Sequence, residues 1–170
     1  ILVLTVGVAL SSCTVSNASI GSSSPWSLID LETEANPLDI SFVDDKNGFL
    51  VGTDRLILET NDGGVSWKER NLDMPSEGNF RLISVDFKDQ EGWIAGQPGL
   101  ILHTSDGGGN WTRLDLGNNL PGDPYLVTTI AKDSAELATT AGAIYKTIDG
   151  GTNWEAIVVD TSGSGGIREM

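Results

Sequence analysis

The sequence predicts an all-β fold, a β-propeller built of four-stranded blades. One motif, T-x-D-G-G-x-x-W, occurs three times, at residues 60–67, 104–111 and 147–154. Its aspartates Asp62, Asp106 and Asp149 lie 44 residues apart (62 to 106) and then 43 residues apart (106 to 149). Short segments between the motifs alternate apolar and polar residues, as half-buried strands do. A repeat of about 40–50 residues with β character is typical of propeller blades.

Each repeat is expected to contain four short strands. An alternating segment comes first, a Gly-bounded apolar segment second, the apolar run before the motif third and a Trp-led segment fourth. The first strands are expected at 40–42, 85–87 and 128–130, the second at 48–52, 92–96 and 136–139, the third at 56–59, 100–103 and 143–146, and the fourth at 67–72, 111–116 and 154–159. Four antiparallel strands joined by turns make one blade.

A further Trp-led segment, residues 26–31, has no motif before it. In closed propellers the first strand often completes the last blade and so removes an exposed sheet edge. We therefore expect residues 26–31 to be such a closing strand. Three and a half blades cannot close a ring, so residues 25–170 are expected to form a partial propeller, and the sequence to be a fragment at both ends.

The motif itself has the composition of a tight turn between two strands. Its short Asp carboxylate can accept hydrogen bonds from nearby backbone N–H groups, and its glycines supply positive φ. The tryptophans Trp67, Trp111 and Trp154 offer large apolar faces to cover the outer layer of each blade. The pattern is the Asp-box of sialidases, sortilin-type receptors and other propellers. We interpret the aspartates as structural rather than catalytic or metal-binding, because a catalytic group is not normally copied into every repeat.

The N-terminal region has the features of a bacterial lipoprotein leader. Residues 1–10 are an apolar run too short to span a bilayer, which fits the remnant of a signal peptide over residues 1–12. A lipobox-like sequence, Leu-Ser-Ser, precedes Cys13, the one cysteine of the chain. Cys13 is therefore a candidate lipidation site and residues 13–24 a flexible tether, with a chance free thiol as the alternative.

Charge and composition disfavour several kinds of function. The net charge is −14, which argues against nucleic-acid binding. The single histidine, His103, is expected to be a strand surface residue. No Ser-His-Asp set, phosphate loop or Cys/His metal cluster is recognisable, so neither a catalytic residue, a metal site nor a cofactor is predicted.

Four segments resemble the photosystem II assembly and stability factor family of cyanobacteria, which has a plant relative in the chloroplast. They are residues 92–104, 120–125, 134–137 and 142–147. The resemblance extends over residues 26–170 and the leader. It implies a propeller of about seven blades on the lumenal side of thylakoid membranes, held by a lipid anchor. It also implies a non-enzymatic helper that binds the newly made reaction-centre subunit D1 and early assembly intermediates during photosystem II biogenesis and repair.

The family's binding role is associated with an arginine-rich patch, and Arg168 falls where that patch would begin. An ordinary solvated strand residue is the alternative for Arg168. The chain departs from the family pattern at Ala135 and Glu136, which replace a Gly-aromatic pair, and in its acidic surface.

Two other functions remain open on the sequence. One is a secreted Asp-box glycoside hydrolase or sialidase, which would need arginines and acids converging on one site. The other is a generic secreted Asp-box binding protein. The arginines of the chain are scattered over different blade positions, which favours the assembly factor.

Overall fold

Twelve strands form three four-stranded antiparallel sheets in the part of the chain that the structure describes. The structure is a computed structural model, and it describes residues 25, 27–72, 74, 79–114, 116 and 120–158. The strands are β1 Pro37–Phe42, β2 Gly48–Gly52, β3 Ile57–Thr60, β4 Lys68–Glu69, β5 Arg81–Lys88, β6 Glu91–Gln97, β7 Leu100–Thr104, β8 Thr112–Leu114, β9 Pro124–Ala131, β10 Ser134–Thr139, β11 Ile144–Thr147 and β12 Glu155–Val158.

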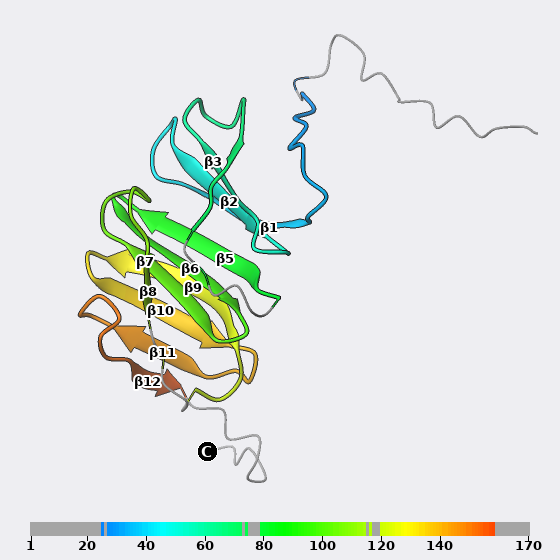
Figure 1. Ribbon diagram of the computed structural model, residues 1–170. Coiled ribbons are helices and arrows are strands. Elements are labelled where there is room, and N and C mark those ends of the chain that lie inside the picture. The colour runs from blue at the N-terminus through cyan, green and yellow to red at the C-terminus, as the bar shows by residue number, and fades with distance from the viewer. Residues whose placement is uncertain are drawn as a thin grey trace, which may run out of the picture.

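In every sheet the strands pair in sequence order, β1 to β4, β5 to β8 and β9 to β12. The sheets lie side by side in Figure 1, with the first strand of each next to the first strand of its neighbour, and β5 contacts both β1 and β9. This is the blade arrangement of a propeller, so the predicted fold class is confirmed.

The fourth strand of each blade is shorter than the sequence suggests, with two residues in β4 and three in β8. These strands are exposed and pair along one edge only, so few hydrogen bonds define their length. Residues 27–31, part of the expected closing strand, form no strand, and Trp26 lies outside the described residues. A closing strand exists only when paired with another blade, so its assignment stays a prediction.

Among the described residues, two of the three core clusters lie between blades, and the third, Leu50, Leu56 and Leu58, covers the outer face of the first blade. Phe49, Val51 and Ile57 of the first blade pack against Leu82 and Ile94 of the second. The opposite face of the second blade packs against the third through Trp93, Ala95, Ile101, Val127 and Leu137. Because both faces of the second blade are buried, its inner strands β6 and β7 are nearly continuous apolar runs.

The departure at Ala135 has a steric explanation. Gly92 is paired with Phe87 across the strands, and a Cβ at Gly92 would overlap the Phe87 ring. Ala135 is paired with Thr129 instead. The smaller threonine leaves room for the methyl group, so the third blade tolerates alanine where the second requires glycine.

Side chains on the first strands of the blades also join neighbouring blades. The Ser41 hydroxyl on β1 accepts a hydrogen bond from the Phe87 N–H on β5 at 3.1 Å. One blade further on, the Asp86 carboxylate accepts from the Thr129 N–H on β9 at 2.6 Å. These bonds satisfy edge N–H groups that an isolated blade would leave unpaired. None of the described residues forms a helix long and apolar enough to cross a bilayer.

Candidate functional site

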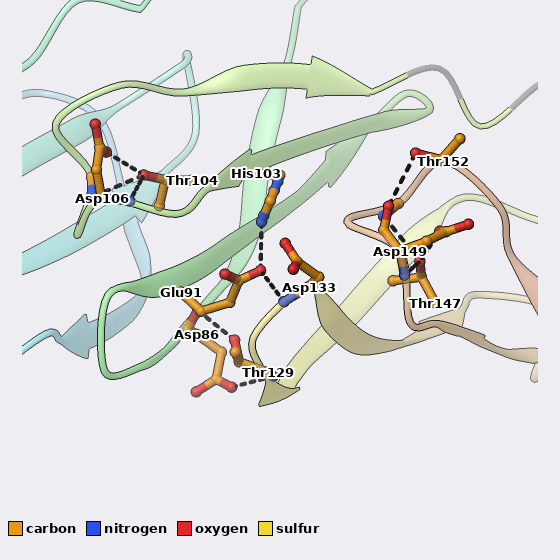
Figure 2. A network of polar contacts seen from close by, with 12 residues as sticks. Asp86, Glu91, His103, Thr104, Asp106, Thr129, Asp133, Thr147, Asp149 and Thr152 are labelled. Atoms are coloured by element: carbon orange, nitrogen blue, oxygen red, sulfur yellow. Dashed lines mark hydrogen bonds and ion pairs between the residues drawn. The ribbon is translucent and has the colours of Figure 1, made fainter.

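The second Asp-box shows how the motif is built. The Thr104 hydroxyl donates to the Asp106 Oδ1 at 2.7 Å and accepts from the Gly108 N–H at 3.1 Å. The Asn110 N–H donates to Asp106 Oδ1 at 2.8 Å, and the Asn110 side-chain amide donates to Oδ2 at 2.7 Å. Asp106 therefore holds both ends of the loop between β7 and β8. Its contact with Thr104 is drawn in Figure 2.

The other two boxes repeat this geometry. Asp62 accepts from the Thr60 hydroxyl and from both the N–H and hydroxyl of Ser66, while Asp149 accepts from Thr147 and from both groups of Asn153. The hydrogen bonds, from the Ser66 side chain first, lower the pKa of Asp62 to about 2. Those of Asn110, its backbone N–H first, lower the pKa of Asp106 to about 2, and the Asn153 side chain lowers the pKa of Asp149. Each carboxylate is used in its own turn as an ionised acceptor.

The two glycines of each box do different work. The first glycine donates its N–H to the turn between the first two strands of the same blade, from Gly107 to the Gln90 carbonyl at 2.8 Å. The second glycine, Gly108 or Gly151, has positive φ and lies against an aromatic ring of the preceding blade, Phe49 or Trp93. Each box thus ties its own blade together, and the second and third boxes also let the preceding blade approach closely.

The tryptophans of the second and third boxes also pack against the preceding blade. Trp111 packs edge-on against Phe49 of the first blade, and Trp154 packs edge-on against Trp93 of the second, with ring centroids 5.8 and 5.7 Å apart. They therefore stabilise the contact between blades. Among the described residues, no group of three or more metal-ligating side chains includes Asp62, Asp106 or Asp149.

A cleft of about 520 Å³ opens where the first strands of the blades begin. Leu38, Arg81, Ile83, Tyr125 and Leu126 from β1, β5 and β9 line it, with Asp39, Ser84, Gln97 and Thr140. Within the described part of the chain, the Arg81 guanidinium makes no hydrogen bond or ion pair. The cleft therefore combines apolar walls with one available cation, which suits a peptide carrying a carboxylate.

The prediction for His103 is wrong, because it is not a surface residue. Its side chain is 13% exposed, stacks on Trp93 with ring centroids 4.1 Å apart, and lies 2.6 Å from the buried Glu91 carboxylate. The Asp133 N–H donates to the same Glu91 oxygen at 3.0 Å. Sequence reasoning missed Glu91, Asp133 and Arg81. Comparing the repeats gives a signal for Glu91, because the first blade has Asn47 at this position before the shared glycine.

Two predicted site residues, Cys13 and Arg168, lie outside the described residues. Their roles stay predictions.

A family model and individual relatives of this chain agree on one family. The model of the photosynthesis system II assembly factor YCF48 family matches residues 18–170. A photosystem II assembly lipoprotein Ycf48 of Prochlorococcus marinus (strain NATL2A) is 88% identical over 169 residues, which cover 99% of this chain and 50% of the relative. The chain spans about half the length of the curated relatives it matches.

Two solved structures are also similar. A structure described as YCF48 bound to D1 peptide is 44% identical, with a TM-score of 0.78 over 81% of this chain and 44% of that one. YCF48 from Cyanidioschyzon merolae is 43% identical, with a TM-score of 0.71 over 78% of this chain and 40% of that one.

Proposed function

The chain belongs to the Ycf48 family of photosystem II assembly factors, and from that premise we propose that its protein is a non-enzymatic assembly and stability factor for photosystem II. The observation that carries the proposal is family membership over nearly the whole chain. The geometry agrees with it, because the aspartates of the repeated motifs accept hydrogen bonds within their own turns and glycines of the second and third motifs pack between blades. The blades then serve as a rigid support for a binding surface.

The proposed partner is the newly made reaction-centre subunit D1, together with early assembly intermediates. A relative 44% identical to this chain has been solved with a D1 peptide bound. The cleft is one candidate contact. Arg81 can pair there with a peptide carboxylate while Leu38 and Tyr125 bury apolar side chains. Arg168 is proposed as a second cationic contact.

The proposed location is the lumenal side of the thylakoid membrane, with the protein held by a lipid on Cys13. Support comes from the names of the relatives, which are lipoproteins, and from the lipobox-like sequence before Cys13. A tether raises the effective concentration of a membrane-embedded partner, so a modest intrinsic affinity suffices. Mass spectrometry of the native protein tests this step. An unmodified Cys13, or retention of residues 1–12, would contradict it.

The glycoside hydrolase alternative lacks support in the structure. A paired-carboxylate mechanism needs two carboxyl groups facing one sugar-binding site. The three box carboxylates instead lie in three separate turns and accept hydrogen bonds within them. The family assignment also favours assembly over hydrolysis.

Affinity purification from solubilised thylakoids tests the function as a whole. The tagged intact protein is expected to enrich D1 and early reaction-centre intermediates over a tag-only control. Enrichment without any reaction-centre subunit, or turnover of fluorogenic sialosides or glucans, would overturn the proposal.

A further inference from the structure

We propose that Glu91, His103 and Asp133 form a binding site for one divalent transition-metal ion, best suited to Zn²⁺, between the second and third blades. One ligand atom from each of these side chains lies within 4.8 Å of the other two. They come from three separate segments: the start of β6, strand β7 and the turn between β9 and β10. Figure 2 shows the three side chains gathered between the two Asp-boxes.

The donor set suits the ion. Imidazole nitrogen and carboxylate oxygen bind Zn²⁺ at about 2.0–2.2 Å, and tetrahedral geometry separates the ligand atoms by about 3.4 Å. His103 Nε2 and Glu91 Oε1 are now 2.6 Å apart, joined by a hydrogen bond. A metal ion would replace that bond, and the three ligand atoms, now within 4.8 Å of one another, would have to settle at the tetrahedral spacing. Among the described residues, none donates a hydrogen bond to the Asp133 carboxylate, so that group is available.

The charges also favour a cation. Two carboxylates share the site with one imidazole, and Glu91 is only 5% exposed. Lys88 and Lys132 line a neighbouring cavity of about 180 Å³ together with Glu91. Neither lysine forms a salt bridge with Glu91 or Asp133 in the described part of the chain, and the Lys88 ammonium donates to the Ile130 carbonyl. A divalent ion would neutralise the buried negative charge.

Of the two contacts between blades in the described part of the chain, only this one has the three residues. Gln90 and Asp133 are equivalent, because each accepts the N–H of the first box glycine through its carbonyl. At the contact between the first and second blades, the corresponding positions are Asn47, Glu59 and Gln90. Glu59 is engaged there by Arg70 at 2.7 Å. A blade contact therefore forms without this cluster, so its residues are not a requirement of the repeat.

The bound ion would fasten two blades together. Glu91 and His103 belong to the second blade and Asp133 to the third. An ion that binds only the folded arrangement stabilises it in proportion to the logarithm of its concentration over its Kd. The expected consequence is a stiffer blade contact beside the Asp-boxes.

Zinc titration of the intact, untagged protein, stripped of metal with a chelator, tests the site. Calorimetry and elemental analysis after dialysis against Zn²⁺ are expected to give one bound Zn²⁺ per chain. Asp133→Asn and Glu91→Gln each remove one ligand at nearly constant volume and should weaken binding at least tenfold. Zn²⁺ should also raise the Tm of the unmodified protein and not that of these variants.

Asp89→Asn is the matched control. Asp89 and Asp133 have the same φ of 56°, lie in equivalent turns, and asparagine tolerates that conformation. Asp89 lines the neighbouring cavity but is outside the cluster, so its variant should bind Zn²⁺ normally. The proposal is overturned if the unmodified protein retains no more Zn²⁺ than Asp133→Asn, or if Asp89→Asn loses as much binding as the cluster variants.

Discussion

At the residue scale, the box aspartates act through their ionised form. Hydrogen bonds lower the pKa of Asp106 to about 2, so its contribution to stability is present above its unfolded pKa, near 4, and is lost as pH falls through about 2. In Asp106→Asn one of the two carboxylate oxygens is replaced by an NH₂ group, which cannot accept a hydrogen bond. We expect this variant to be less stable at pH 7 than the unmodified protein, and the difference to shrink between pH 4 and pH 2.

Urea unfolding at a series of pH values measures that difference. Asp45→Asn serves as the control, because Asp45 is exposed and none of the described residues donates a hydrogen bond to its carboxylate. A stability difference for Asp106→Asn that stays constant from pH 7 to pH 2 would show that the carboxylate charge is not what holds the turn.

Gly151 illustrates a steric requirement on a single residue. A Cβ there would overlap Leu114 and lie 3.1 Å from Trp93, and φ is +83°. In Gly151→Ala, the left-handed backbone conformation should lower the free energy of unfolding by about 1–2 kcal/mol, and overpacking of the methyl group by about a further 1–3 kcal/mol. Gly99→Ala should cost only the first part, since nothing lies within 4 Å of its Cβ position. Chemical denaturation of both variants compares these costs. Equal destabilisation would contradict the packing argument.

At the scale of strands and blades, hydrogen bonds between the first strands of neighbouring blades hold the blades together. Asp86 accepts from the Thr129 N–H at 2.6 Å, and Thr129 is 6% exposed. Asp86→Ala leaves that buried N–H without its acceptor, so we expect the free energy of unfolding to fall by about 1–3 kcal/mol. Thr128→Ala, on the exposed face of the same strand, should change it by less than about 0.5 kcal/mol. Equal losses of unfolding free energy in the two variants, measured by denaturant titration, would show that the Asp86–Thr129 hydrogen bond does not stabilise the contact between blades.

The sequence predicts strands better than it predicts what joins blades. The repeated motif locates the turns and the apolar runs locate β2, β3, β6 and β7, because both signals are local. The environment of His103 depends on Trp93, Glu91 and a turn of the next blade, which come together only in the fold. The other repeats carry the charged residues Glu59 and Lys146 at the position of His103, which favoured a surface residue, whereas here both faces of the sheet are covered. The Arg81 cleft likewise draws on three blades, so no local pattern indicates it.

At the scale of the whole molecule, the cleft connects the blades to the proposed partner. Arg81→Glu places a second negative charge beside Asp39 and opposes a peptide carboxylate. We expect the affinity for a D1 peptide to fall about tenfold, which corresponds to about 1.4 kcal/mol. Arg113→Glu is the matched charge reversal on the exposed outer strand β8 and should leave affinity unchanged. Equal losses in both variants would assign the effect to net charge instead of to the cleft.

On the proposed function, the blades are a scaffold for binding D1 and the repeated aspartates hold that scaffold together. Titration of a fluorescently labelled D1 peptide with the intact protein, followed by anisotropy, tests it most directly. We expect saturable one-to-one binding that persists in Asp106→Asn at neutral pH under conditions where the variant is folded. Absence of binding by the folded, unmodified protein would contradict it, as would loss of binding in a folded Asp106→Asn variant.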